Sequence, residues 1–232
     1  GKDEERLPAE PDYNDIYLKR TNPDPDKETV LIVSHEASRT GAPILSLNII
    51  LLLRDRYNII TCFLRKGNLL QEFLLQCDTA IVLPQTNSQF ILSKLLSEIE
   101  KNHKIKFAIV NSIVSSPVLP ALSQCFIPTI CLIHEFASYT RPQNLIPDAV
   151  TWANDVIFSA QLVYENASEY CPTLKERDIA ILPQGKCLVP NESRLPEHDI
   201  LRMNTFSDDQ LVTVLGAGFV HLRKGVDLFL AC

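Results

Sequence analysis

The chain has 232 residues, of which 46% are hydrophobic and 22% are charged, and its formal net charge is -6. This composition is typical of a globular protein, and the negative charge gives no general attraction for nucleic acid or for an anionic membrane. The longest apolar run, residues 44–53, is shorter than the ~20 residues that a membrane-spanning helix needs. The totals therefore exclude a basic nucleic-acid-binding protein, whereas peripheral membrane association stays open.

Residues 1–28 are rich in Pro, Asp, Glu and Lys, which predicts a mobile arm. From residue 29, short aliphatic runs without polar alternation are separated by segments of helical length, as in parallel strands covered on both faces. Strands are expected at 30–34, 59–64, 80–83, 107–111, 129–133, 156–159 and 179–182. Helices are expected at 43–54, 68–76, 88–102, 116–125, 142–153 and 161–170. This alternation predicts a doubly wound parallel Rossmann-like α/β domain over residues 29–185.

The remaining residues lose this alternation. Residues 186–207 contain prolines and charges, which predicts an interdomain connection. Residues 208–232 comprise an apolar run, a Gly-rich turn and the beginning of a helix. One strand and one helix cannot bury their own apolar faces. We therefore expect residues 208–232 to be the start of a truncated C-terminal domain, or an appendage packed on the first domain.

The seven cysteines are scattered and form no CxxC pair. Several fall in the apolar segments predicted as strands, where a thiol packs as a small hydrophobic group. This pattern predicts a reducing, cytoplasmic environment, without a disulfide framework or a zinc site. No acidic cluster typical of a metal site appears either.

Ligands of open parallel sheets bind beyond the carboxyl ends of the strands, where the strand order reverses. Residues 34–43 leave the first predicted strand there and carry Arg39, Thr40 and Gly41 just before a helix that Pro43 can open. The N–H groups of a helix start, together with the Arg39 guanidinium, favour a phosphate or a carboxylate. The alternative is a plain strand-to-helix turn with exposed polar residues.

Two more loops are expected beside this one. Ser112 follows the fourth strand, where a small hydroxyl leaves room for a ligand; helix capping by Ser115 or Ser116 is the alternative interpretation. His134 and Glu135 follow the fifth strand, and an imidazole there suits a sugar hydroxyl or a developing charge. The alternative is a structural histidine bonded to nearby backbone.

A fourth loop, residues 216–225, lies between the last predicted strand and helix. It is rich in glycine and contains Arg223 and Lys224 next to each other at the helix start. Adjacent cations in this position predict a clamp for a diphosphate. The alternative is a basic turn exposed to solvent.

The order of these motifs resembles the retaining glycosyltransferases of family four, over about residues 29–232. The resemblance rests on the Thr40-Gly41 loop, on His134 after a central strand, on the Pro-Gln-Gly run at 183–185, on the linker and on the Lys224-Gly225 turn. Enzymes of this family have the GT-B fold, in which two Rossmann-like domains face each other across a cleft. The resemblance implies that this chain is the N-terminal half of such an architecture plus the start of its C-terminal domain.

The resemblance also implies an activity, which is transfer of a sugar from a nucleotide-sugar donor to an acceptor substrate without a cofactor. Stabilisation of the leaving nucleoside diphosphate by cationic side chains is then the main catalytic device, and no catalytic metal is implied. The implied roles are catalysis for His134, donor-phosphate binding for Gly41, Arg223 and Lys224, and lining of the substrate cleft for Arg39, Thr40, Ser112 and Glu135.

Two features depart from the family pattern. Phe219 occupies a position where the family usually has Arg, and the paired glutamates of the second domain are absent from the sequence. We therefore expect this fragment to be inactive without the rest of the C-terminal domain. The alternatives are a stand-alone Rossmann-like module that binds a small anionic ligand, and a non-catalytic scaffold domain.

Overall fold

The computed structural model describes residues 16–84 and 88–189. The strands are β1 (Tyr17–Arg20), β2 (Thr29–Ser34), β3 (Asn58–Phe63), β4 (Thr79–Val82), β5 (Ile105–Asn111), β6 (Thr129–Ile133), β7 (Asp155–Phe158) and β8 (Ala180–Ile181). The helices are α1 (Gly41–Leu53), α2 (Leu70–Gln76), α3 (Gln89–His103), α4 (Leu119–Gln124), α5 (Leu145–Trp152) and α6 (Gln161–Tyr170). Three 3-10 helices, at Ile113–Val118, Ala137–Tyr139 and Pro172–Glu176, complete this part of the chain.

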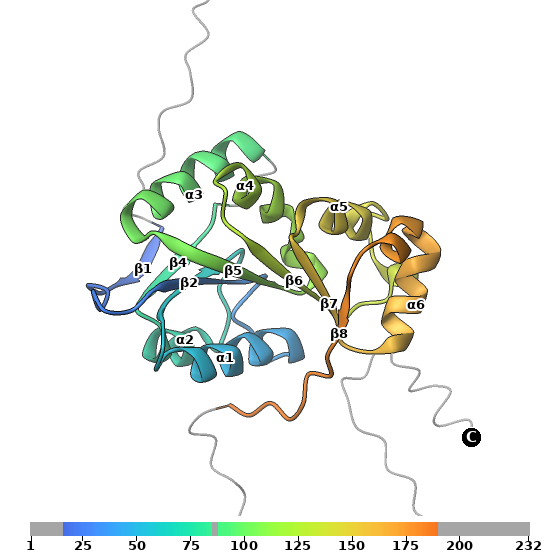
Figure 1. Ribbon diagram of the computed structural model, residues 1–232. Coiled ribbons are helices and arrows are strands. Elements are labelled where there is room, and N and C mark those ends of the chain that lie inside the picture. Colours follow the sequence, from blue (N-terminus) through green and yellow to red (C-terminus); the bar gives the residue numbers. More distant parts are fainter. Residues whose placement is uncertain (1–15, 85–87, 190–232) are drawn as a thin grey trace, which may run out of the picture. The chain divides into compact units, whose positions relative to one another are not determined.

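The described strands form one sheet in the order β1-β4-β3-β2-β5-β6-β7-β8. Every neighbouring pair from β4 to β8 is parallel, and only β1 runs antiparallel to its neighbour. Helices lie on both faces of this sheet (Figure 1). The predicted doubly wound Rossmann-like α/β sheet is therefore confirmed. Each strand and helix expected between residues 29 and 185 is present, and the ends of most of them are shifted.

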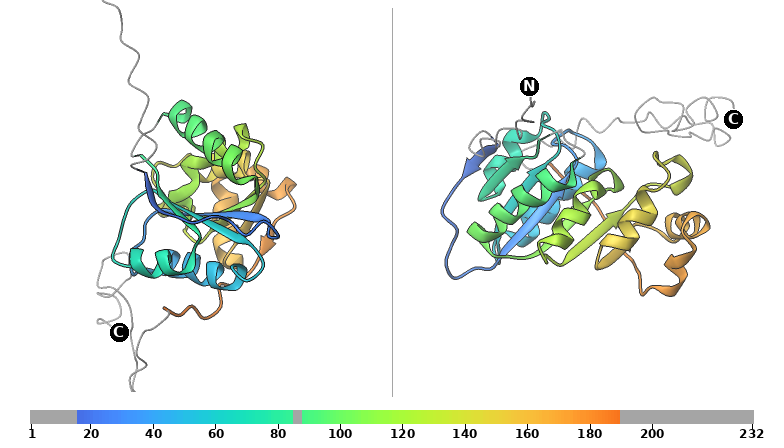
Figure 2. Two further views of the ribbon diagram at one scale, coloured as in Figure 1. Left: turned by 90° about the vertical axis from the view of Figure 1, so that its left-hand side faces the viewer. Right: turned by 90° about the horizontal axis from the view of Figure 1, so that it is seen from above.

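Two apolar cores lie on opposite faces of the sheet. Along β2, Leu31 and Val33 belong to one core and Val30 and Ile32 belong to the other, because successive side chains of a strand point to opposite faces. Helices α3, α4 and α5 cover the core that contains Leu31 and Val33. Helices α1 and α2 cover the core that contains Val30 and Ile32 (Figures 1 and 2). Burial on both faces explains why the central strands are continuous apolar runs in the sequence.

Within the predicted mobile arm, the structure describes residues 16–28, and they include a strand. Tyr17–Arg20 forms the edge strand β1, which pairs with β4 and shifts register after Tyr17. Lys19 Nζ donates to the carbonyl oxygens of Leu74 at 2.7 Å and Cys77 at 2.5 Å, so β1 is also tied to α2 and its end. Most side chains of this strand are only partly buried, and it therefore lacks the aliphatic run by which the other strands were predicted.

The segment after β8 leaves the sheet and runs back to α1 (Figure 1). Asn48 on α1 donates to the Leu188 carbonyl oxygen at 2.7 Å and accepts from the Leu188 N–H at 3.1 Å. Val189 is buried in the core on the α1 side. Residues 186–189, expected as part of an interdomain connection, thus pack on the first domain, and the predicted continuation over 190–232 lies outside the described residues.

The strand order reverses between β2 and β5, which pair in parallel with Ser34 opposite Asn111. From β2 the chain proceeds through α1 to β3 and β4 on one side, whereas β5, β6, β7 and β8 follow one another on the other side. The carboxyl ends of β2, β5 and β6 are therefore neighbours. This is the position at which open α/β sheets bind ligands.

Candidate functional site

Asn111, the last residue of β5, connects three elements around the point where the strand order reverses. Its amide nitrogen donates to the Ala42 carbonyl oxygen at 2.6 Å and to Ser46 Oγ at 2.7 Å, both on α1. Its amide oxygen lies 2.7 Å from His134 Nε2, beyond the end of β6. Asn111 and Ser46 are completely buried, so the hydrogen bond between them is protected from water.

His134 immediately follows β6. Burial lowers the pKa of His134 below its usual range, and the nearby negative charge of Glu135 opposes part of this shift. The imidazole is therefore neutral at neutral pH. While Nε2 faces Asn111, Nδ1 faces the side-chain amide of Gln184, which comes from the segment after β8. The two ring nitrogens are thus hydrogen-bonded to residues from opposite sides of the site.

Glu135 joins the ends of β5 and β6. Its carboxylate accepts hydrogen bonds from the Ser112 hydroxyl, from the Ile113 N–H at 3.2 Å and from the His134 N–H at 3.0 Å. Ser112 has a φ of 75°, a left-handed backbone conformation that is uncommon for a residue with a Cβ. The Glu135 carboxylate therefore stabilises a strained turn directly beside His134.

The serines after β5 have different structural roles from the predicted ones. Ser112 Oγ, and not that of Ser115 or Ser116, accepts from a backbone N–H at the start of the 3-10 helix, namely that of Val114 at 3.3 Å. The Ser115 hydroxyl donates to the Asn111 carbonyl oxygen at 2.7 Å. The capping interpretation thus applies to the residue that was expected to line the substrate cleft, and capping leaves its contact with Glu135 intact.

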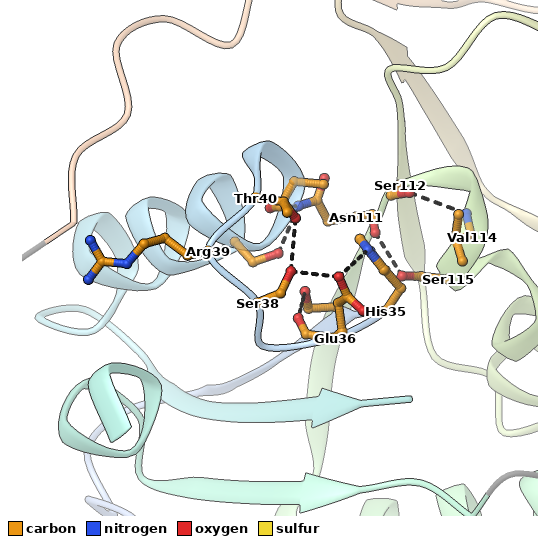
Figure 3. A network of polar contacts seen from close by, with 12 residues as sticks. His35, Glu36, Ser38, Arg39, Thr40, Asn111, Ser112, Val114 and Ser115 are labelled. Atoms are coloured by element: carbon orange, nitrogen blue, oxygen red, sulfur yellow. Dashed lines mark hydrogen bonds and ion pairs between the residues drawn. The ribbon is translucent and has the colours of Figure 1, made fainter. Parts of the chain in front are cut away.

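The loop after β2 contains a chain of polar contacts, shown in Figure 3. Ser38 Oγ donates to Glu36 Oε1 at 2.5 Å and lies 2.9 Å from Thr40 Oγ1, while His35 Nε2 lies 3.6 Å from the same carboxylate oxygen. Burial lowers the pKa of His35, and the charges of Glu36 and Glu135 oppose this shift. Since Glu135 acts on His35 electrostatically, the loops after β2 and β6 belong to one electrostatic environment.

Gly41 begins α1, next to this loop. No atom lies within 4 Å of the position that a Cβ would occupy, and Thr40 makes no side-chain cap to the helix. The first turn of α1, all of which the structure describes, contains no acidic residue. Arg39 Nη2 lies 4.0 Å from Glu72, and its side chain extends away from Asn111 and Ser112 (Figure 3). The cleft-lining role of Arg39 stays a prediction.

The structure brings together three of the predicted site residues, Ser112, His134 and Glu135. Thr40 lies in the loop after β2, where it contacts Ser38. Arg223 and Lys224, the predicted diphosphate clamp, lie outside the described residues, as does Phe219. Sequence reasoning missed Asn111 and Gln184 as site residues. The signal for Asn111 was its place at a strand end next to Ser112, and that for Gln184 was the Pro-Gln-Gly run at 183–185.

Two negative findings apply to the described part of the chain. No group of three or more His, Cys, Asp or Glu side chains in residues 16–84 and 88–189 is arranged to hold a metal ion. No helix in the same residues has the length and apolar character needed to cross a membrane.

No protein-family model matches this chain, and no curated protein matches it by sequence. Among solved structures, Alr3699/HepE from Anabaena in complex with UDP-glucose is similar, with a TM-score of 0.56 and 16% identity over 68% of this chain and 44% of that one. The same protein in complex with UDP gives a TM-score of 0.52 and 17% identity, with the same coverage of both chains. The chain has the fold of a GT-B half-domain. It spans less than half of the length of these structures, and at this identity the likeness concerns the fold alone.

Proposed function

We propose that this chain is the N-terminal half of a nucleotide-sugar-dependent glycosyltransferase of the GT-B type. The observation that carries the proposal is the Asn111–His134 hydrogen bond at the reversal of strand order, where such folds bind ligands. The similar structures of Alr3699/HepE hold UDP-glucose and UDP, which supports a nucleotide sugar as donor substrate.

In the proposed mechanism, the neutral imidazole of His134 contacts the reacting sugar. A neutral ring can donate or accept a hydrogen bond without adding a charge that the transition state would have to accommodate. The N–H groups at the start of α1, beside Gly41 and Thr40, favour the donor phosphates, because a helix start carries partial positive charge. Arg223 and Lys224 complete the proposed stabilisation of the leaving diphosphate, so neither a metal nor a cofactor is part of the proposal.

We further propose that the enzyme is a retaining transferase of family four, located in the cytoplasm, whose acceptor binds mainly on this half. The order of the motifs in the sequence supports the family assignment. The scattered cysteines support the location, since Cys62, Cys77, Cys131 and Cys171 are buried as free thiols in the described part of the chain. The second domain is then the partner that supplies most of the donor site.

The test is transfer of sugar from UDP-glucose and other nucleotide sugars, measured with the 232-residue chain and with the product of its whole natural gene. We expect turnover only in the second case. In the whole protein, His134→Ala should lower kcat/KM by roughly 10²-fold, which is typical of the loss of a positioned polar contact in the transition state.

The matched control is His103→Ala, because His103 lies at the end of α3 and belongs to none of the loops described above. It should leave transfer unchanged. Turnover by the 232-residue chain alone would overturn the proposal that it is half of the enzyme. Unchanged transfer by the His134→Ala protein would favour a non-catalytic scaffold domain, and binding of UDP by the chain as tightly as by the whole protein would favour a stand-alone module.

A further inference from the structure

The orientation of the Asn111 amide is determined by a neighbour that can only accept. The carbonyl oxygen of Ala42 lies 2.6 Å from one terminal atom of this amide. A carbonyl oxygen has no hydrogen to donate, so this atom must be the NH₂ group of Asn111. Ser46 Oγ, at 2.7 Å from the same nitrogen, adapts by rotating its own hydrogen. The amide oxygen of Asn111 is then the atom that faces His134.

This orientation in turn determines the tautomer of His134. The Asn111 amide oxygen can only accept, and it lies 2.7 Å from His134 Nε2, so Nε2 must carry the hydrogen. Burial keeps the ring neutral, and the opposite nitrogen, Nδ1, therefore has an unshared electron pair. Gln184 satisfies this lone pair by pointing its own NH₂ group at Nδ1. In the other tautomer, the lone pair of Nε2 would face the Asn111 amide oxygen, which is also an acceptor. The Nδ1–H would face the NH₂ group of Gln184, which is also a donor.

We propose that Asn111 is a positioning residue that holds His134 in the Nε2–H tautomer, and that Gln184 occupies the acceptor Nδ1 until a hydrogen-bond donor of a ligand replaces it. Asn111 does this from a completely buried position, tied to α1 through Ala42 and Ser46. Gln184 lies in an exposed segment without regular secondary structure, so its amide can leave the ring at little cost.

The tautomer defines which chemical group the imidazole takes. A lone pair on Nδ1 attracts a hydroxyl hydrogen and repels a phosphate oxygen, which carries only acceptors. The site is thereby divided into a hydroxyl-accepting side at the end of β6 and an anion-favouring side at the start of α1. Identifying the hydroxyl as one of the sugar rests on the proposed function, whereas the tautomer itself does not.

The tautomer is measured by ¹⁵N NMR of the histidine rings in the 232-residue chain, at a pH where His134 is neutral. We expect a single Nε2–H form, with Nδ1 in the chemical-shift range of a ring nitrogen without hydrogen. Asn111→Ala should lose this single form and give a mixture of both tautomers. Ser46→Ala is the matched control, since it removes one partner of the Asn111 amide and leaves the anchoring carbonyl of Ala42, so it should keep the Nε2–H form.

Gln184→Ala tests the second part. It should keep the Nε2–H tautomer but shift the Nδ1 resonance, because water replaces the amide. A wild-type ring in the Nδ1–H form or in a mixture would overturn the proposal even if the Asn111→Ala chain did not fold. So would a pure Nε2–H form in Asn111→Ala, or an unchanged Nδ1 resonance in Gln184→Ala. None of these results depends on sugar transfer, so failure here is distinguishable from failure of the proposed function.

Discussion

At the scale of single residues, two glycines near the candidate site differ in what a side chain would meet. A Cβ on Gly67 would lie 2.3 Å from the carbonyl carbon and oxygen of Ala37 and 2.6 Å from the Ser38 nitrogen, all backbone atoms. A Cβ on Gly41 would meet nothing within 4 Å. Gly67 thus allows a second loop to support the loop after β2, where the Leu69 N–H also donates to the Ala37 carbonyl oxygen at 2.7 Å.

We predict that Gly67→Ala lowers the free energy of unfolding by about 1–3 kcal/mol, the usual cost of overpacking, because backbone atoms must move to make room for the Cβ. Gly41→Ala should change stability by less than about 1 kcal/mol, since alanine favours a helix and has space there. Urea denaturation of both variants checks this. Equal losses of stability in the two variants would contradict the prediction that the backbone of Ala37 and Ser38 leaves no room for a Cβ at Gly67.

The same scale shows how far the sequence predicted the site. Ser112, His134 and Glu135 were expected to be neighbours because each follows a buried parallel strand, and their contacts with one another or with Asn111 confirm this. Gln184 could not be placed, because it lies 50 residues from His134 in sequence and reaches the ring through an irregular segment. Local patterns predict where strands end, and they do not predict how such a segment crosses the sheet.

At the scale of elements, Glu135 is the main polar link between the loops after β5 and β6. It accepts from two backbone N–H groups and from the Ser112 hydroxyl, and Ser112 has the strained backbone of this turn. Without the carboxylate, these donors would lose their partner in a partly buried position. The ends of β5 and β6 would then still be joined by the Asn111–His134 hydrogen bond.

We predict that Glu135→Ala lowers the free energy of unfolding by about 1–3 kcal/mol, the usual cost of leaving such donors unpaired. Glu135→Gln should lose less, because its amide oxygen still accepts. Chemical denaturation provides the measurement, and Glu98→Ala serves as control. The Glu98 carboxylate makes exposed contacts, with Lys101 at 3.7 Å and with the Asn102 amide at 3.5 Å, and changes at such sites stay within about 0.5 kcal/mol. A Glu135→Ala chain as stable as the control would contradict a linking role.

Elements themselves differed in how well they could be predicted. The strands β2 and β3 were recognisable because both of their faces are buried, whereas β1 buries its side chains only partly. The helix expected at 116–125 begins instead at Leu119, after a 3-10 helix that contains Pro117. Proline lacks the N–H group that a regular helix would use, a constraint that hydrophobic periodicity does not register.

At the scale of the whole molecule, partly buried histidines make the stability of the fold depend on pH. Burial lowers the pKa values of His35, His103 and His134 below the ordinary 6.5. A lowered pKa in the folded state means that the unfolded chain binds more protons, so the free energy of unfolding rises with pH. The histidines therefore do not reduce the free energy of unfolding at pH values above their unfolded pKa of 6.5. They reduce it increasingly as the pH falls below that value.

We therefore predict that the chain loses stability between about pH 7.5 and about pH 5.5, a range in which exposed carboxylates hardly titrate. Urea denaturation at the two pH values measures the difference. Replacing His103 by Gln should reduce this difference, because one proton-binding group that is suppressed by folding has been removed. Stability that is constant or higher at the lower pH would contradict the assignment of these rings as neutral and buried.

The outer strands of the described sheet bear on how this chain behaves in concentrated solution. An exposed edge offers unpaired backbone groups to which another chain can add as a further strand, which is a common route to aggregation. Here one edge is the four-residue antiparallel strand β1, which carries Lys19 and Arg20, and the other is the two-residue strand β8. Both edges are short and β1 is also charged, so they give an incoming strand little to pair with. The strand β1, which the sequence pattern did not predict, thus helps to prevent copies of this domain from associating through their sheet edges.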